Sequence, residues 1–428
     1  MKRAVVHIVG AGAAGLAAAR ALAADGRRHV VVHECAPYVG GRRRSFHDEA
    51  LGLDFDTGNF PLISSWTASL SLIEAIGARD EWREDAEPGV AFADFSTGER
   101  WRLRPNAGRA PWWLLGGKWR GVGLRLSDFW AARRLISPSP GATVASVAPG
   151  EPGRTKLWRP LTLAALNAPP EIASAQLAGA LLRRILFAGG AGLRILTPVN
   201  GFGRGFTEPL ARNLQRLGAA LRFERRLVAL DFGPERLTSL EFEHDRVDLG
   251  PRDTLILATP WSVTASLVPG VPAPTGASAA MTVHFAAPPP PRTPAVVATL
   301  NGPFDWLFAY HDRLSVTIKD AAAQLDAPRD RVAAECWLAV AALTALSDAL
   351  PAWRIVPSRR ASALATPEET ARRPLCRTPW PNLFLAGGHV GRLLPDSIEN
   401  AVRSGAEAAR LALGDEDLRA RAETSQRA

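Results

Sequence analysis

The sequence predicts an α/β fold in which a parallel nucleotide-binding sheet is interleaved with a second domain of the α+β class. Two stretches near opposite ends of the chain carry this prediction: "AVVHIVGAGAAG" at 4–15 and "NLFLAGGHVGRLLPDSIENAVRSG" at 382–405. Each joins a short apolar run to a glycine turn and leads into a helix-like run, which is typical of a strand, turn and helix. Alternating runs between them predict further strands.

The first stretch predicts a complete βαβ unit. Residues 4–9 form a valine-rich apolar run, "LAAARALAADG" is helical in composition, and "HVVVHE" at 29–34 is a second strand. The glycines stand in G-x-G-x-x-G register: Gly10 permits a tight turn, Gly12 lets the backbone approach a pyrophosphate, and Gly15 lets helix and strand pack closely. Glu34 ends the second strand, where its carboxylate can accept hydrogen bonds from ribose hydroxyls. We therefore predict a Rossmann-like dinucleotide site.

A second glycine pair follows the acid and bears on which dinucleotide binds. The chain reads "CAPYVGGRRRSF", which places Gly40, Gly41 and Arg42 beyond Glu34. Glycine amides and a guanidinium can meet the same pyrophosphate. This arrangement resembles the flavoprotein amine oxidase and carotenoid desaturase superfamily, and it favours FAD over NAD. Arg43 and Arg44 fit a solvated arginine run better.

The stretch "LDFDTGNF" at 53–60 reads as a strand that ends in a turn. An ordinary turn remains an alternative. In the superfamily that it resembles, the matching stretch lies against the flavin, which implies Gly58 and Asn59 as neighbours of the ring.

The middle of the chain changes character. "RAPWWLLGGKWRGVGLRLSDFWAARRLI" at 109–136 mixes Trp112, Trp113, Trp119 and Trp130 with lysine and arginine, which suits either a membrane interface or a helical lobe with tryptophan inside. The run at 156–190 predicts two helices interrupted at 168–170. A helix ending near Gly218, a strand at 221–230 and a buried strand at 253–260 follow.

These patterns divide the chain into two interleaved domains. Residues 1–92, 191–262 and 370–415 are assigned to the FAD-binding domain, because the superfamily completes its nucleotide domain from distant segments. Residues 93–190 and 263–369 are assigned to a substrate domain that faces the membrane, with strands around "AMTVHFA" and "RLSVTIKD". Residues 416–428 are polar and predict a flexible tail.

Composition narrows the function classes. The 51 Lys and Arg exceed the 42 Asp and Glu, giving a net charge of +9, but no nucleic-acid recognition motif accompanies the charge. The three cysteines are far apart, so neither a disulfide framework nor a metal site is predicted. No apolar run is long enough to span a bilayer. We expect a cytoplasmic protein at the inner face of the cytoplasmic membrane.

Over nearly its whole length the chain resembles the squalene-associated FAD-dependent desaturases, and among them the hydroxysqualene dehydroxylases of bacterial hopanoid synthesis. The general part of the resemblance is "GAGAAG", "GGR" and "LFLAGG"; the specific part is "DTGNFPLISS", "PWWLL", "LWRPLTLAALNAPPEIASAQL" and "LPDSIENAVRSG". It implies an amine-oxidase-type FAD fold and reductive removal of the hydroxyl of 12-hydroxysqualene to give squalene. A desaturase, an amine oxidase and a degenerate flavin-fold scaffold at the membrane remain alternatives.

The same resemblance makes the second glycine turn the closing half of one FAD site. Residues 382–386 would be a strand of the first sheet, Gly387 and Gly388 would pass the ribityl chain, and a helix from Ile398 would direct its amides at the flavin. Contacts to FAD are also expected from Ala13, Ala14, Leu227 and Ser397. A hydrophobic isoprenoid substrate and an association with presqualene or hydroxysqualene synthases are implied.

Two residues depart from the pattern of this family. Phe60 stands where the family usually has histidine, and Gly388 stands where it usually has an aspartate that accepts a hydrogen bond from a ribityl hydroxyl. The second change should weaken FAD retention by about 1 to 3 kcal/mol if nothing replaces the carboxylate. His389 is a candidate acid near the flavin, with an ordinary polar role as its alternative, and no catalytic residue is assigned.

Overall fold

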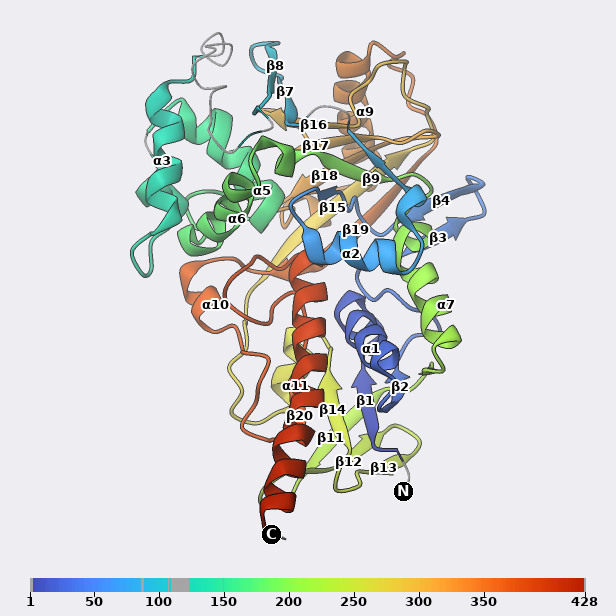
Figure 1. Cartoon of the computed structure of the whole chain (residues 1–428). Coiled ribbons are helices and arrows are strands. Elements are labelled where there is room, and N and C mark those ends of the chain that lie inside the picture. The colour runs from blue at the N-terminus through green and yellow to red at the C-terminus, as the bar shows by residue number, and fades with distance from the viewer. Residues whose placement is uncertain (1–2, 86–87, 107, 109–122, 149, 427–428) are drawn as a thin grey trace.

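The computed structural model describes residues 3–85, 88–106, 108, 123–148 and 150–426. Its lower part contains the nucleotide-binding sheet, and its upper part contains a larger sheet with helices on both sides (Figure 1). Both ends of the chain lie at the foot of the lower part. Segments from the start, middle and end of the sequence therefore meet in one domain.

The lower sheet is parallel and has the strand order β10, β2, β1, β14, β20. Val9 pairs with Leu257, and Leu257 pairs with Leu385, so the carboxyl ends of three strands from distant parts of the chain meet at one edge. Parallel strands covered on both faces need continuous apolar runs, as these have. The strands are β1 (Val5–Val9), β2 (His29–His33), β10 (Ala220–Arg222), β14 (Thr254–Leu257) and β20 (Leu383–Leu385).

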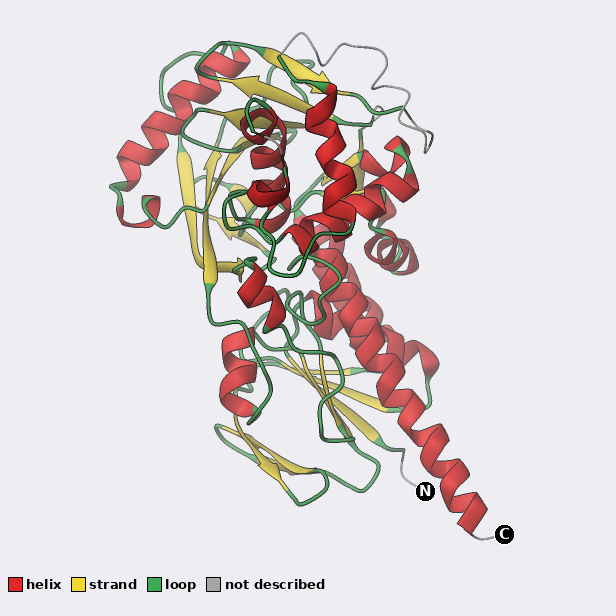
Figure 2. Cartoon of the chain, turned by 90° about the vertical axis from the view of Figure 1, so that its left-hand side faces the viewer, coloured by secondary structure: helices red, strands yellow, loops and turns green. Residues whose placement is uncertain are grey.

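Helices α1 (Ala13–Asp25), α7 (Glu208–Arg216) and α11 (Ile398–Gln426) pack beside this sheet. A β-carbon on Gly405 of α11 would lie 2.2 Å from the carbonyl oxygen of Ala14, so glycine is what lets α11 cross α1 closely. Figure 2 shows α11 running along the lower domain and beyond it. Residues 416–426 of the tail that was predicted to be flexible continue helix α11, and their alanine, glutamate and arginine favour a helix.

A small antiparallel sheet contains β11 (Leu227–Phe232), β12 (Leu237–Phe242) and β13 (Arg246–Asp248). The single strand predicted at 221–230 is therefore wrong. Its first residues form β10 beside β2, and its last residues form β11 beside β12. The apolar pattern runs through both, but Glu224 takes a left-handed conformation with φ of 55° and the chain changes sheets there.

The upper sheet has seven strands in the order β19, β15, β18, β17, β16, β7, β8. Strand β7 pairs with β16, so the domain boundary predicted at residue 92 cuts through a strand of the upper sheet and belongs before Val90. An apolar pattern reveals a strand but not its sheet. The strands are β7 (Val90–Asp94), β8 (Arg100–Leu103), β15 (Ala277–Phe285), β16 (Val296–Leu300), β17 (Trp306–Ala309), β18 (Leu314–Lys319) and β19 (Trp353–Ala363).

The upper sheet carries apolar helices on both faces. Helix α9 (Arg329–Thr344) covers one face, where Trp337 packs against Phe285 with ring centroids 5.1 Å apart. The other face meets a helical lobe made of α3 (Leu126–Ile136), α4 (Val144–Val147), α5 (Arg159–Leu166) and α6 (Ala175–Ala188). The predicted interruption between two helices thus lies between α5 and α6.

Short elements join the two parts. They are the hairpin β3 (Ser45–Asp48) and β4 (Leu53–Asp56), the sheet of β5 (Leu62–Ile63), β9 (Ile195–Pro198) and β6 (Trp82–Glu84), and the helices α2 (Thr67–Ala75), α8 (Trp261–Leu267) and α10 (Pro367–Ala371). Trp112, Trp113 and Trp119 of the predicted interface stretch lie outside the described residues. Within the described residues, no helix is long and apolar enough to cross a membrane.

Candidate active site

The glycines of the first turn leave an open cradle at the sheet edge. A β-carbon on Gly10 would lie 2.6 Å from the carbonyl oxygen of Ala258, and one on Gly15 would lie 1.9 Å from that of Gly10. A β-carbon on Gly12 would meet nothing within 4 Å. Gly10 and Gly15 are therefore needed for packing, whereas Gly12 borders free space.

This cradle fits an anion. Helix α1 begins after Gly12 with no side-chain cap and no acidic residue in its first turn, which contains Ala13 and Ala14. Its first amides and its dipole point at the free space. Gly41 lies directly beside Gly12, because a β-carbon on Gly41 would meet the α-carbon of Gly12 at 3.5 Å. The residues present therefore fit a dinucleotide pyrophosphate.

The predicted ribose acceptor, Glu34, is buried at the end of β2. One carboxylate oxygen accepts the amide of Ala11 at 2.7 Å, and the other accepts the amide of Ala36 at 3.0 Å. The second oxygen also accepts the thiol of Cys35 at 3.3 Å. These bonds fix the carboxylate against the glycine turn, and the oxygen that accepts Ala11 keeps a lone pair for a further donor. Leu227 begins β11 nearby, and its side chain packs into a core cluster that contains Val9.

Gly58 and Asn59 lie between the two domains. Asn59 donates to Ser315 and Thr317, both at 2.9 Å, and accepts from the hydroxyl of Tyr310 at 2.9 Å. Its amide therefore fastens the end of this loop to strand β18 and the β17–β18 turn. The ring of Phe60 lies 2.9 Å from the place of a β-carbon on Gly58, so this phenylalanine covers the glycine.

The closing half of the site follows β20. Gly387 exchanges hydrogen bonds with the hydroxyl of Ser404, each 2.9 Å long, and the carbonyl of Gly388 accepts the amide of Asn400 at 2.6 Å. Ser397 caps the start of α11 through the amide of Asn400 at 3.2 Å. The donor to Gly388 is the side-chain amide of Asn400, whereas the donor to Ser397 is its backbone amide. The glycine turn is thus fastened to the first turns of α11, and Ile398 is buried at its start.

Arg42 was expected at the pyrophosphate and His389 was a candidate acid, but their contacts and burial in the structure differ from these roles. The guanidinium of Arg42 pairs with the carboxylate of Asp396 at 3.1 Å and donates to the carbonyl of Ala361 at 3.1 Å. His389 is buried beside Gly387, and burial lowers its pKa to about 4. It is therefore neutral at pH 7 and a poor proton donor. Asp396 was not foreseen from the sequence.

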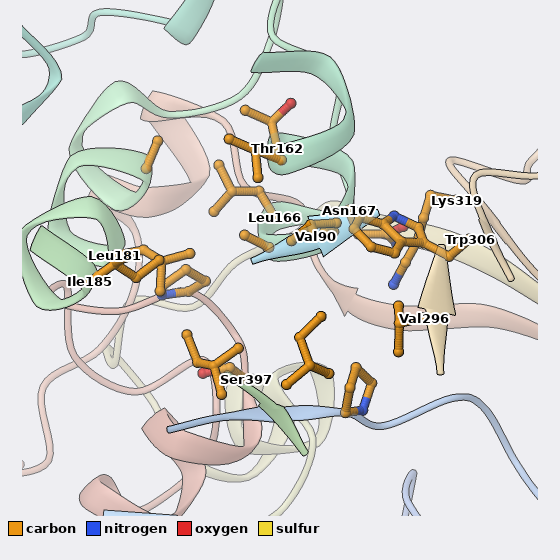
Figure 3. Close-up of a pocket in the computed structure, with 18 of the residues that line it drawn as sticks. Val90, Thr162, Leu166, Asn167, Leu181, Ile185, Val296, Trp306, Lys319 and Ser397 are labelled. Atoms are coloured by element: carbon orange, nitrogen blue, oxygen red, sulfur yellow. The ribbon is translucent and has the colours of Figure 1, made fainter. Parts of the chain in front are cut away.

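A cavity of about 620 Å³ opens from this closing half into the upper domain. Figure 3 shows its walls: Leu166 of α5, Leu181 and Ile185 of α6, Val296 and Trp306 of the upper sheet, and Ser397 at the lower side. Gly58, Asn59 and Ile398 also line it. The residues predicted to lie near a flavin ring thus form one end of a largely apolar chamber.

Lys319, at the end of β18, brings a cation to this wall beside Trp306 and Asn167 (Figure 3). Burial lowers its pKa to about 8, opposed by the charge of Asp305. Asp396 also lines the cavity, but its pKa lies well below its usual range, because the charge of Arg42 outweighs its burial. Among the described cavity residues whose pKa departs from its usual value, Lys319 has the pKa nearest to neutrality.

The structure gives a role to Asn167, the asparagine of the stretch "LNAPP". It ends α5 in a left-handed conformation with φ of 51°, which asparagine tolerates better than most residues. Its side chain donates to the carbonyl of Ala279 at 3.1 Å and accepts the amide of Asp320 at 3.3 Å. These contacts join the helical lobe to the strand ends beside Lys319.

Comparison with known proteins places this geometry in a family. The model of the family described as "Flavin containing amine oxidoreductase" matches residues 13–413. The chain belongs to this family. Membership confirms the prediction of a flavin cofactor, and the dinucleotide cradle fits FAD. Within the described residues, no cluster of three or more histidine, cysteine, aspartate or glutamate side chains could hold a metal ion.

Relatives and structures agree with the family. The chain is 38% identical over 410 residues to "Hydroxysqualene dehydroxylase" of Rhodopseudomonas palustris, covering 95% of this chain and 98% of that protein. It is 39% identical to the protein of that name from Sinorhizobium fredii, covering 96% and 98%. A putrescine oxidase variant matches with a TM-score of 0.72 at 18% identity, covering 98% and 99%. Cyclohexylamine oxidase of Brevibacterium oxydans matches at 0.71 and 17%, covering 98% and 100%. These amine oxidases confirm the predicted fold class.

Proposed function

We propose that this flavoprotein is a hydroxysqualene dehydroxylase, which reductively removes the hydroxyl of 12-hydroxysqualene to give squalene. The observation that carries the proposal is the apolar cavity, which joins the flavin-side residues Gly58 and Ile398 to the helical lobe. A long isoprenoid needs such a chamber, and an allylic alcohol within it needs one proton donor. Two relatives of matching length bear the name of this activity.

The proposed reaction breaks a C–O bond and forms a C–H bond, releasing water. When bound in its reduced form, FAD supplies a hydride. Lys319 supplies the proton to the departing hydroxyl and becomes a neutral amine as positive charge develops on the allylic carbon. The ring of Trp306, beside Lys319, stabilises that positive charge by a cation–π interaction, and the apolar wall excludes water.

The direct test is anaerobic incubation of the FAD-loaded protein, photochemically reduced, with 12-hydroxysqualene. We expect squalene to form in proportion to the flavin oxidised, measured by gas chromatography with mass detection and by absorbance near 450 nm. Bound, reduced flavin that forms no squalene contradicts the proposal. Protein that is colourless and takes up no FAD would instead favour a scaffold without redox chemistry.

Lys319 also supports an alternative function, that of an amine oxidase, because flavin amine oxidases often place a lysine beside the flavin. The rival predicts that an amine, or a polyene in the case of a desaturase, reduces the oxidised flavin anaerobically. We expect no bleaching with primary amines or polyene precursors, measured in the same cuvette as the alcohol assay. Bleaching within the turnover time would favour oxidation over dehydroxylation.

We also propose that the helical lobe contacts the cytoplasmic face of the membrane, where a synthase could hand over the substrate. On α3, Trp130 is 60% exposed and Leu126 is 46% exposed, and Trp130 and Phe129 both line the cavity, so the exposed side of α3 adjoins the chamber. We expect Trp130→Glu with Leu126→Glu to lower co-sedimentation with anionic vesicles about 10-fold, because interfacial burial of both side chains is lost. Leu350→Glu, on an exposed loop, is the matched control. Equal binding by all three proteins would contradict this contact.

A further inference from the structure

Asp396 occupies the space beside Gly388. A β-carbon on Gly388 would lie 1.8 Å from Asp396 Oδ1 and 2.9 Å from its carboxyl carbon. A side chain at position 388 and the present carboxylate of Asp396 therefore cannot coexist. The carboxylate that is missing at position 388 is matched by one that reaches the same place from a residue further along the chain.

The carboxylate is held rigidly. Oδ2 accepts the guanidinium of Arg42 at 3.1 Å and the amide of Ala363 at 3.1 Å. Among the described residues, Oδ1 has only a long contact of 3.4 Å with the second nitrogen of Arg42, and this oxygen points toward Gly388. Burial raises its pKa, but the charges of Arg42 and Arg43 outweigh this and keep the carboxyl ionised. Oδ1 is thus an ionised acceptor with spare capacity.

Asp396 lies between the site expected for the pyrophosphate of FAD and the site expected for its ring. Through Arg42 it contacts the loop that carries Gly41, which lies beside Gly12 at the pyrophosphate cradle. On its other side it lines the cavity with Gly58, at the end expected to hold the ring. The ribityl chain joins the pyrophosphate of FAD to its ring, so its hydroxyls must pass between these two places.

We propose that Asp396 accepts the hydrogen bond from a ribityl hydroxyl of FAD, and that Gly388 is the residue that makes room for it. The two positions form an exchangeable pair: either one, but not both, supplies the carboxylate. This inference rests on the flavin site and not on the identity of the substrate, so it can fail or succeed independently of the dehydroxylation test.

The first test measures the FAD dissociation constant of four FAD-free proteins by flavin fluorescence. We expect Asp396→Ala to weaken binding about 10- to 100-fold, because a charge-assisted hydrogen bond is lost. Gly388→Asp alone should weaken it as much, because its side chain collides with Asp396. The double variant should return to within about 3-fold of the original protein. If the double variant, Asp396→Ala with Gly388→Asp, binds FAD no more tightly than the single variants, the two positions are not exchangeable and the proposal is wrong.

The second test separates hydrogen bonding from a merely structural role. FAD analogues lacking the 2′, 3′ or 4′ ribityl hydroxyl are titrated into the original protein and into Asp396→Asn, whose melting temperatures without flavin are compared. We expect one analogue to bind the original protein about 10- to 100-fold more weakly than FAD, and Asp396→Asn to discriminate between them less than 3-fold. If Asp396→Asn retains the original discrimination, Asp396 acts only by anchoring Arg42.

Discussion

Replacing Lys319 by methionine is expected to slow squalene formation by about 100- to 10,000-fold, the usual contribution of a positioned general acid. Methionine has a similar length and leaves the apolar cavity filled, and Lys319 belongs to the upper sheet, whereas the glycine cradle belongs to the lower one. FAD binding should therefore remain within about 3-fold of the original protein. Single-turnover oxidation of the reduced flavin by 12-hydroxysqualene measures the chemical step directly. A loss below about 3-fold would remove Lys319 from the reaction.

The pH dependence gives an independent signature of this lysine. Its pKa is lowered from 10.5 to about 8, so the ammonium that donates the proton is present below pH 8 and is lost above it. The single-turnover rate should be level from pH 6 to about 7.5 and then fall about tenfold per pH unit above pH 8. Lys319→Arg, whose guanidinium stays protonated throughout this range, should be slow and should lack this fall. A fall near pH 8 that persists in Lys319→Met would belong to another group.

Gly12→Val is expected to abolish FAD retention without unfolding the protein. Gly12 has φ of −78° and ψ of 179°, which valine adopts readily, and its β-carbon would meet nothing within 4 Å. The added methyl groups fill the space in which the pyrophosphate approaches the backbone. We expect FAD affinity to fall by about 100-fold or more, equivalent to about 2.7 kcal/mol. The melting temperature without flavin should change by only about 2 °C.

Gly15→Val is the matched control for this experiment. Its β-carbon would lie 1.9 Å from the carbonyl oxygen of Gly10, so helix α1 must move away from the sheet. Both FAD binding and the melting temperature of the FAD-free protein should fall together. If Gly12→Val lowered the melting temperature as far as Gly15→Val does, Gly12 would be a packing residue and would not border a pyrophosphate site.

The local parts of this protein could be predicted from its sequence. The βαβ unit around Gly10, Gly12 and Gly15 is specified by neighbouring residues, and β20 was expected in the same sheet because of the resemblance. The strand at 221–230 could not be resolved, because apolar alternation does not say when a chain changes sheets. The boundary at residue 92 failed for the same reason, since β7 pairs with β16 from far along the sequence.

The candidate site shows a similar limit. The departure at Gly388 was visible, but its partner Asp396 was not, because only the folded loop brings the carboxylate against the glycine. A weak signal existed: an acid stands directly before the first turn of α11 in the segment that lacks its usual acid. Lys319 gave no such signal. Alternation along β18 assigns its side chain to a face, but the helical lobe decides that this face lines a cavity.

The dispersed order of the lower sheet has a consequence for how the protein is made. During synthesis β1 and β2 emerge before β14, and β20, the neighbour of β14 in the sheet, emerges long after it. Pairings so distant in sequence form slowly. Until β20 arrives, β14 presents an open edge of residues that are all buried in the finished protein. We therefore expect capture of the flavin to follow the emergence of β20, and we expect a nascent protein stalled before Leu383 to be exposed to aggregation and degradation.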